Sequence, residues 1–296
     1  MTTVRKILRD YNVLPRKRLG QSFLEDKNII SKIVYAADIK DNDTVVEIGA
    51  GLGVMTELLA LQARKVIAID IDPRMINILQ ERFKDRPKVS VIERDVLSYD
   101  FSSSLDGDAR GKIKIVGNIP YNISTQILFR LVEFRHQISS MVLLFQKEVA
   151  DRITASPGGK DYGIPSVIVS MYAHVSREMN VPASCFYPQP TVTSSLIKIV
   201  MREKPPIEPV DDEFFVRIVK VAFSKRRKTI LNNLRSADLP GYSEEKLNLL
   251  LKEIDIDGRR RGETLSIAEF VRLSNALLTA RFCKHNNCNK VRNMII

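Results

Sequence analysis

The residues best suited to chemistry in this sequence lie in one short segment, Asn118-Ile119-Pro120-Tyr121. The side-chain oxygen of Asn118 and the carbonyl of Pro120 are hydrogen-bond acceptors, and Tyr121 offers an aromatic face. Two acceptors directed at an adenine amino group would localise the nitrogen lone pair, which is otherwise delocalised into the ring. Tyr121 would stack on the same base after it has flipped out of its helix. The segment predicts a site that modifies an exocyclic amine; the alternative is an ordinary turn.

Glycines cluster in a second segment, residues 47–53, with the sequence E-I-G-A-G-L-G. Such glycines let a backbone turn sharply and approach a ligand at a helix N-terminus. The dinucleotide fingerprint G-x-G-x-x-G fails, because Val54 stands where its third glycine would be. A carboxylate about 20 residues beyond such a loop can accept both ribose hydroxyls, and Asp70 is placed to do so. We therefore expect Gly49, Gly51 and Asp70 to bind an adenosine cofactor without a pyrophosphate, namely S-adenosylmethionine.

A further acid, Asp95, ends the third predicted strand. At the carboxyl edge of a parallel sheet it could accept a hydrogen bond from the adenine amino group of the cofactor. The alternative is that Asp95 caps a helix or turn.

The elements that must position these residues alternate between short apolar runs and amphipathic stretches. This alternation predicts a Rossmann-like, doubly wound α/β domain with a mostly parallel sheet. Two further strands, 176–181 and 194–200, are joined by a proline-rich loop without a long helix, which predicts an antiparallel edge. The expected parallel strands are 44–48, 65–69, 89–92, 113–116 and 141–145, with helices at 55–62, 74–83 and, capped by Ser124, 125–134.

Three prolines in residues 202–212 mark a linker, and beyond it the pattern is helical throughout. We expect a cofactor-binding domain over 1–203, a small all-helical domain over 204–280 and a disordered tail over 281–296. The expected helices are 214–223, 229–234, 244–252 and 268–278, the last opened by a Ser266–Glu269 capping box.

The positive charge of the chain is concentrated in two places. Residues 1–20 carry +5 and residues 217–235 carry +7 of a total net charge of +11, so the remainder is close to neutral. Two basic patches favour a nucleic-acid partner over a merely solvated surface. The residues expected to contact RNA are Arg16, Lys17, Arg18, Lys225, Arg226, Arg227 and Lys228.

Several segments together make the sequence similar to the KsgA-type family of rRNA adenine N6,N6-dimethyltransferases. They follow the family order over nearly the whole chain, up to about residue 278. The segments are PRKRLGQSFL (15–24), VEIGAGLG (46–53), NIPYNIST (118–125), FQKEV (145–149), FYPQPTVTS (186–194), FSKRRKTILNNL (223–234) and GETLS (262–266).

The resemblance implies roles for individual residues. Cofactor contacts are expected at Ser22, Leu24, Gly49, Asp70, Asp95 and Asn118, and target contacts at Asn118, Tyr121 and Phe186, which would stack on the second face of the adenine. Two positions depart from the family pattern. The family usually has Asn at 22 and Glu at 70, and both side chains are shorter here.

The resemblance also implies a function: dimethylation of two adjacent adenosines in the 3′-terminal hairpin of 16S rRNA, with a role in small-subunit biogenesis. Three alternatives stay open. They are a large-subunit rRNA methyltransferase of the macrolide-resistance type, a non-catalytic RNA-binding assembly factor on the same fold, and a small-molecule methyltransferase, which would leave the basic patches unexplained.

Other features bound the setting of the protein. Apolar residues are 44% and charged residues 27% of the chain, as in ordinary globular proteins. There is no secretory signal and no apolar run long enough to span a membrane. Three cysteines make a disulfide framework implausible, and Cys283, His285 and Cys288 lack zinc-finger spacing, so no metal is expected. We expect a cytoplasmic monomer.

Overall fold

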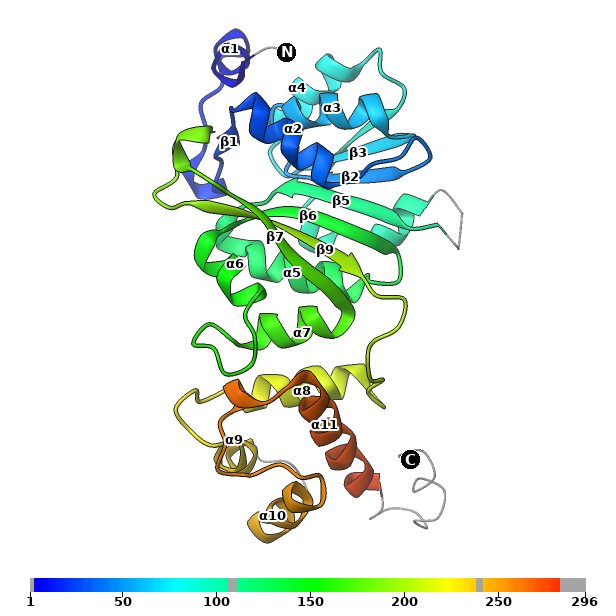
Figure 1. Cartoon of the computed structure of the whole chain (residues 1–296). Coiled ribbons are helices and arrows are strands. Elements are labelled where there is room, and N and C mark those ends of the chain that lie inside the picture. Colours follow the sequence, from blue (N-terminus) through cyan, green and yellow to red (C-terminus); the bar gives the residue numbers. More distant parts are fainter. Residues whose placement is uncertain (1–2, 106–110, 238–241, 283–296) are drawn as a thin grey trace. The chain divides into compact units, whose positions relative to one another are not determined.

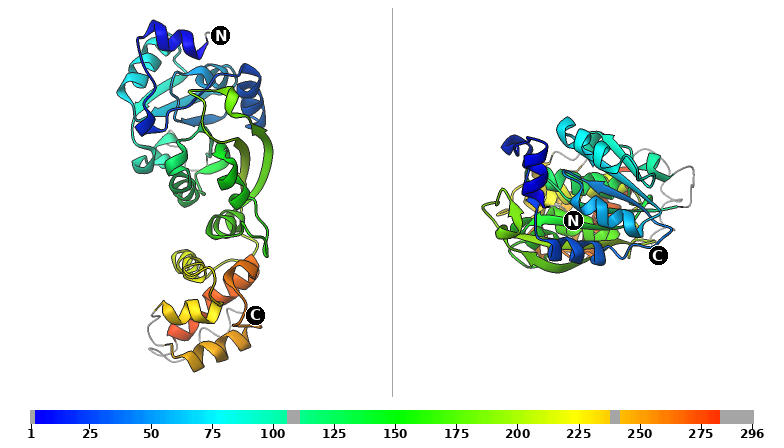
Figure 2. Two further views of the ribbon diagram at one scale, coloured as in Figure 1. Left: turned by 90° about the vertical axis from the view of Figure 1, so that its left-hand side faces the viewer. Right: turned by 90° about the horizontal axis from the view of Figure 1, so that it is seen from above.

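The computed structural model describes residues 3–105, 111–237 and 242–282 (Figure 1). The chain divides into two compact units. The first contains residues 1–154 and 173–202, and the second contains residues 155–172 and 203–296. Figure 2 shows the same ribbon from two further sides.

The first unit is built on a seven-stranded sheet with the order β4-β3-β2-β5-β6-β9-β7. Neighbouring strands from β4 to β6 are parallel, whereas β9 pairs antiparallel with both β6 and β7. The predicted antiparallel edge is therefore confirmed. The strands are β2 (Thr44–Ile48), β3 (Lys65–Asp70), β4 (Val89–Glu93), β5 (Ile113–Asn118), β6 (Ile138–Gln146), β7 (Ala173–Val181) and β9 (Ser194–Met201).

Helices cover both faces of this sheet. The chain moves from β2 to β3 and β4 in one direction, and from β5 to β6 in the other. Because parallel crossovers are right-handed, α3 (Val54–Gln62) and α4 (Pro73–Phe83) lie on one face, and α5 (Ser124–Glu133) lies on the opposite face. Such a doubly wound sheet has a crevice where the direction reverses, here between the carboxyl ends of β2 and β5.

A core beneath one face joins α2 (Lys27–Ala36) and α3 to the sheet. Helix α2 contributes Ile30, Ile33 and Val34, each at most 2% exposed. Asp26 caps α2 by accepting the N–H groups of Asn28 and Ile29. Neither α2 nor α6 (Lys147–Ile153), which follows β6 directly, was expected from the sequence.

An N-terminal arm (residues 3–24) precedes the sheet. It begins with α1 (Val4–Asp10), whose buried residues pack against Leu52 and Met75, and it ends in β1 (Phe23–Leu24). β1 pairs antiparallel with β8 (Phe186–Tyr187) in a separate two-stranded sheet. The arm is thus an ordered part of the first unit and is connected to a segment far away in the sequence.

The second unit is helical. It contains α7 (Ile164–Tyr172), α8 (Asp212–Ala222), α9 (Ile230–Ser236), α10 (Glu244–Glu253) and α11 (Ile267–Phe282). The division between the units falls between residues 202 and 203, and residues 155–172 also group with the helical unit. The Tyr172 hydroxyl donates to Asp212 at 2.7 Å, and the rings of Tyr162 and Phe223 lie 6.1 Å apart.

The predicted helix caps are right in one case and wrong in the other. The Ser266–Glu269 capping box is confirmed, since each backbone N–H donates to the other side chain, at 2.7 and 3.2 Å. Ser124 does not cap α5, because it is the first helical residue and Ile123 occupies the cap position. Its hydroxyl donates instead to the carbonyl of Tyr121.

Within the described residues, no helix combines the length and the apolar character needed to cross a membrane. Cys283, His285, Cys288 and the rest of the expected tail from 283 onwards lie outside those residues.

Candidate active site

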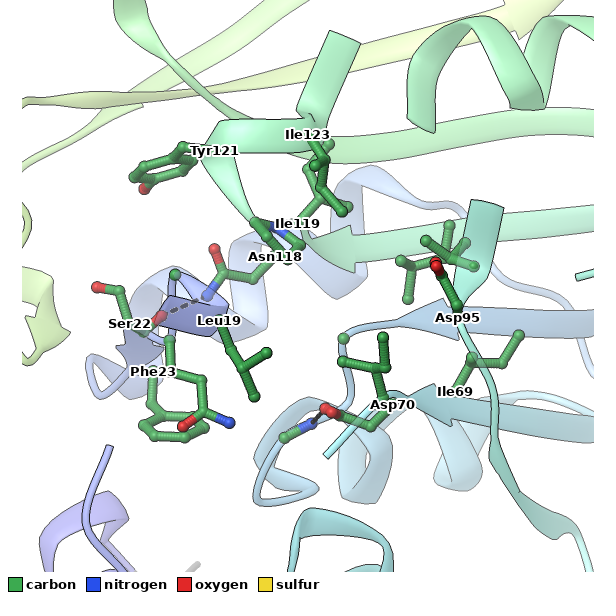
Figure 3. A pocket seen from close by; sticks show the side chains of 18 of the residues that line it. Leu19, Ser22, Phe23, Ile69, Asp70, Asp95, Asn118, Ile119, Tyr121 and Ile123 are labelled. Carbon is green, nitrogen blue, oxygen red and sulfur yellow. Dashed lines mark hydrogen bonds between the residues drawn. The ribbon is translucent and has the colours of Figure 1, made fainter. Parts of the chain in front are cut away.

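A pocket occupies the crevice between the carboxyl ends of β2 and β5 (Figure 3). Its empty volume is about 770 Å³, which includes open solvent at its mouth. Segments from five parts of the first unit line it: residues 19–23, residues 48, 49 and 51, residues 69–71, residues 94–96, and residues 118–121 and 123. Most of the predicted cofactor and target residues therefore meet at one site.

Asp70, at the end of β3, accepts a hydrogen bond from the backbone of the glycine loop. One carboxylate oxygen accepts the N–H of Gly51 at 2.8 Å, and the other accepts the N–H of Asp72 at 2.9 Å. Burial raises the pKa of Asp70 above its ordinary value, and these backbone hydrogen bonds oppose the rise. Each oxygen keeps further lone-pair capacity toward the pocket.

The glycine loop has the backbone that its sequence predicts. Gly49, Gly51 and Gly53 all have positive φ, between 54° and 72°, which is costly for other residues. A Cβ at Gly51 would also lie 2.9 Å from the ring of Phe23, in the N-terminal arm. Glycine is thus required at position 51 both by the turn and by the wall that packs against it.

Glu47 lies behind this loop and is 1% exposed. It accepts a hydrogen bond of 2.5 Å from the Thr56 hydroxyl. Burial raises the pKa of Glu47 to about 8, despite that hydrogen bond. Through this hydrogen bond the buried carboxyl joins β2 to α3.

Asp95 lines the pocket and is also a cap. Its Oδ1 accepts the N–H of Leu97 at 2.9 Å, at the start of a short 3-10 helix. Its Oδ2 has no hydrogen-bond partner among the residues that the structure describes. Both interpretations of Asp95 are therefore compatible, because one oxygen caps and the other is free to accept.

Asn118 ends β5, and its side-chain amide is held in one orientation. Its Nδ2 donates to the backbone carbonyl of Ser22 at 2.7 Å, as the dashed line in Figure 3 shows. Oδ1 then remains as an acceptor, without a partner in the described part of the chain. This is the orientation needed to accept a hydrogen bond from an amine.

Tyr121 and Pro120 complete the edge of the pocket beyond Asn118. The Tyr121 hydroxyl lies 2.5 Å from the hydroxyl of Ser194, at the start of β9. Burial raises the pKa of Tyr121, and the hydrogen bond to Ser194 opposes the rise. The Pro120 carbonyl accepts a long hydrogen bond, 3.3 Å, from the N–H of Ile123, and its second lone pair stays available.

The N-terminal arm forms the wall opposite Asp70 and is fastened by Asp72, which sequence reasoning missed. Asp72 has a fully buried side chain at the start of α4, and it accepts from Gln21 at 2.8 Å and pairs with Arg74 at 2.5 Å. Arg74 also donates to the carbonyl of Leu14. Burial alone would raise the pKa of Asp72, but the hydrogen bonds from Arg74 and Gln21 lower it. The Asp72-Pro73 sequence, typical of a helix start, was the available signal.

Arg16 belongs to this fastening as well. Its guanidinium lies 3.7 Å from Asp72, and its predicted RNA contact stays a prediction. Arg18 is exposed, and the side chain of Lys17 lies outside the described residues.

Two predicted site residues lie outside this pocket. Leu24 is 8% exposed and lines a smaller cavity between the arm and the glycine loop. Phe186 is 1% exposed and packs with Leu24, Val181 and Leu196 in the core beneath the sheet. This burial favours the alternative, a core residue, and the stacking role of Phe186 stays a prediction.

The basic run 225–228 lies in the loop between α8 and α9 and is exposed. Arg226 departs from its neighbours, because it pairs with Glu263 at 3.1 Å and donates to the carbonyl of Lys160. These contacts lie within the helical unit and make Arg226 less available to RNA than its neighbours, while its predicted RNA contact stays a prediction. Lys225, Arg227 and Lys228 form no ion pair with a described residue.

The family model for Ribosomal RNA adenine dimethylase matches residues 13–278. A ribosomal RNA small subunit methyltransferase A from Syntrophus aciditrophicus is 47% identical over 277 residues, covering 94% of this chain and 99% of the relative. A protein of the same name from a Geobacillus species is 43% identical, covering 92% and 95%.

Two solved structures extend the comparison. A dimethyladenosine transferase from Plasmodium falciparum is 30% identical with a TM-score of 0.72, covering 88% of this chain and 98% of that one. The 23S rRNA methyltransferase ErmE is 25% identical with a TM-score of 0.64, covering 86% and 99%. The match over nine-tenths of the chain confirms the resemblance found in the motifs, and the chain belongs to the ribosomal RNA adenine dimethylase family.

Proposed function

We propose that this protein transfers methyl groups from S-adenosylmethionine to the N6 atoms of two adjacent adenosines in the 3′-terminal hairpin of 16S rRNA. The observation that carries the proposal is the orientation of Asn118. Its Nδ2 is occupied by the Ser22 carbonyl, so its Oδ1 is an acceptor at the edge of a pocket with two carboxylates on its far side.

The residues around the pocket fit the cofactor. Asp70 lies at the end of β3, where a carboxylate binds ribose hydroxyls, and the free oxygen of Asp95 suits an adenine amino group. Apolar lining from Ile69, Ile71 and Val96 suits the faces of the base. When bound, S-adenosylmethionine supplies an electrophilic sulfonium methyl group.

The chain's own residues act on the acceptor amine. Asn118 Oδ1 and the Pro120 carbonyl accept hydrogen bonds from the two N–H groups of the amine. These hydrogen bonds direct the nitrogen lone pair out of conjugation with the ring. Tyr121 offers its ring to the flipped base, with its orientation fixed by the hydrogen bond to Ser194. These are positioning and electrostatic contributions, made by groups that are already in place before the substrate arrives.

The small ribosomal subunit is favoured as the partner. The relatives named for the small subunit are 41–47% identical, whereas the 23S rRNA methyltransferase is 25% identical. Exposed basic side chains provide phosphate contacts in each unit: Arg18 in the first, and Lys225, Arg227 and Lys228 in the second. A purely structural assembly factor would not need the oriented Asn118 amide. We further propose that the protein works as a monomer in the cytoplasm.

The direct test uses labelled S-adenosylmethionine and small subunits that lack the modification. We expect label in N6,N6-dimethyladenosine after nucleoside analysis. Label in large-subunit rRNA would instead support the macrolide-resistance type, and subunit binding without any transfer would support the assembly factor.

Cofactor binding is tested separately by calorimetry. Asp95→Ala removes an acceptor for a buried donor, which costs about 1–3 kcal/mol, so affinity should fall by roughly one to two decades. Unchanged affinity would contradict the proposed position of the adenine.

A further inference from the structure

Ser22 is where the family pattern usually has an asparagine, and the sequence predicts a cofactor contact there. In the structure its hydroxyl is used elsewhere. Ser22 Oγ donates to the backbone carbonyl of Pro188 at 2.8 Å. The same residue's backbone carbonyl accepts the Nδ2 of Asn118 at 2.7 Å.

The bond to Pro188 continues a longer connection. Immediately after Ser22, β1 pairs with β8, with Phe23 opposite Tyr187. The hydrogen bond from the Ser22 hydroxyl to Pro188 extends this strand pairing by one residue on each side, at the end near the pocket. It therefore fixes the backbone of residue 22 against the segment 186–194.

The far end of that segment is attached to the acceptor side of the site. Ser194, whose side chain is buried, is the hydrogen-bond partner of the Tyr121 hydroxyl. The carbonyl of Thr193 accepts the N–H of Lys147 at 2.9 Å. The segment thus runs from a contact with Ser22 to a contact with Tyr121.

We propose that Ser22 is a positioning residue for the methyl acceptor, and that its hydroxyl serves this side of the site instead of the cofactor. It holds its own carbonyl in place through Pro188, and that carbonyl sets the Asn118 amide with Oδ1 outward. This inference rests on the proposed function, because it assigns Asn118 to the acceptor amine.

The test compares two variants that have the same shape and differ in one hydroxyl, Ser22→Thr and Ser22→Val. Single-turnover methyl transfer to subunits and calorimetric cofactor affinity are measured for each. Loss of one neutral hydrogen bond corresponds to about a tenfold change at most. We expect Ser22→Val to slow transfer by about five- to tenfold with cofactor affinity within about twofold, and Ser22→Thr to retain the wild-type rate.

Ser139→Ala is the matched control, because its hydroxyl also donates to a backbone carbonyl, that of Ile113, away from the pocket. Its transfer rate should equal that of the wild type. A rate for Ser22→Val that matches the wild type overturns the proposal. So does a loss of cofactor affinity as large as the loss of rate, since it would place the hydroxyl on the cofactor.

Melting temperatures distinguish a variant that is destabilised from one in which only the Asn118 amide is displaced. If Ser22→Val melts far below Ser22→Thr, Ser22→Ala is measured in its place with the same criteria. Failure of the proposed function would look different, because the wild type itself would then transfer no methyl group to the subunits.

Discussion

Asn118 is the residue whose removal should affect chemistry most. Asn118→Ala removes the acceptor aimed at the amine, and loss of one such preorganised group typically costs about 10²–10³ in rate. We therefore expect single-turnover methylation to fall by at least about 100-fold, with a much smaller change in RNA affinity. Asn122→Ala, a neighbouring exposed amide outside the pocket lining, is the control. Near wild-type methylation by Asn118→Ala would refute the mechanism.

For individual residues, the sequence predicts which side chains line the pocket better than it predicts the hydrogen bonds among them. Gly49, Gly51, Asp70, Asp95 and Asn118 all line it, because carboxyl ends of neighbouring parallel strands meet at one edge. Their individual roles stay predictions.

The internal bonds depend on pairing between distant segments, which no local pattern encodes. Ser22 contacts Pro188, and Asp72 binds Gln21 and lies 3.7 Å from the guanidinium of Arg16. Ser22 was expected to contact the cofactor and Asp72 had no predicted role, and in both cases tertiary packing determines the partner.

Strand β8 contains Phe186, which the family resemblance assigned to stacking on the target adenine and which the structure places in the core. Because its ring is buried, Phe186→Ala should destabilise the protein by about 3–5 kcal/mol, as large-to-small core substitutions of aromatic residues do. Urea unfolding measures this directly. Tyr187→Ala, at a half-buried position that contacts Arg5, should cost less. Full stability with a large loss of methylation would return Phe186 to the acceptor site.

The start of α11 should carry a pH-dependent part of the stability. Glu269 pairs with Arg260 and accepts the Ser266 N–H. Burial alone would raise the pKa of Glu269, but the hydrogen bonds from Arg260 and Ser266 lower it from 4.5 to about 2. A lowered folded-state pKa stabilises the fold above the unfolded value, and this stability is lost as the pH falls through the folded value.

The melting temperature of Glu269→Gln should therefore lie below that of the wild type above pH 4.5, and the gap should close as the pH falls toward 2. Glu253→Gln, at an exposed position near the end of α10, is the control and should show no such gap. A gap for Glu269→Gln that is constant from pH 7 to pH 3 would contradict the assigned ion pair.

The helices and strands that the sequence predicts are those whose apolar residues repeat with a clear helical or strand period. The central strands and α8 to α11 are found within a few residues of the expected bounds. By contrast, α1, α2, α6 and α7 were missed, and β1 and β8 have two residues each. So short a strand has no periodicity to detect, and it forms because its partner is held opposite it.

For the molecule as a whole, RNA binding should depend on salt through exposed charges. Each phosphate contact contributes about 0.7–0.9 to the slope of log affinity against log salt. Replacing Lys225, Arg227 and Lys228 by Gln should make the slope shallower by about 2–3 units, with cofactor affinity unchanged. Arg226→Gln is the matched control and should alter the slope little, because Arg226 is bound to Glu263. An unaltered slope for the triple variant would show that the loop does not contact RNA.

The hydrogen bond between Ser22 and Pro188 spans 166 positions of the sequence. A ribosome releases the chain from its N-terminus, so β1 is among the first parts synthesised, whereas its partner strand β8 is synthesised much later. Closing so long a loop is entropically costly until the intervening sheet has formed. A nascent chain that ends before β8 has Asp70 and the glycine loop but no partner strand for β1. The acceptor side of the site, with Ser22 bound to Pro188 and Tyr121 bound to Ser194, can therefore form only after the chain has been synthesised past Ser194.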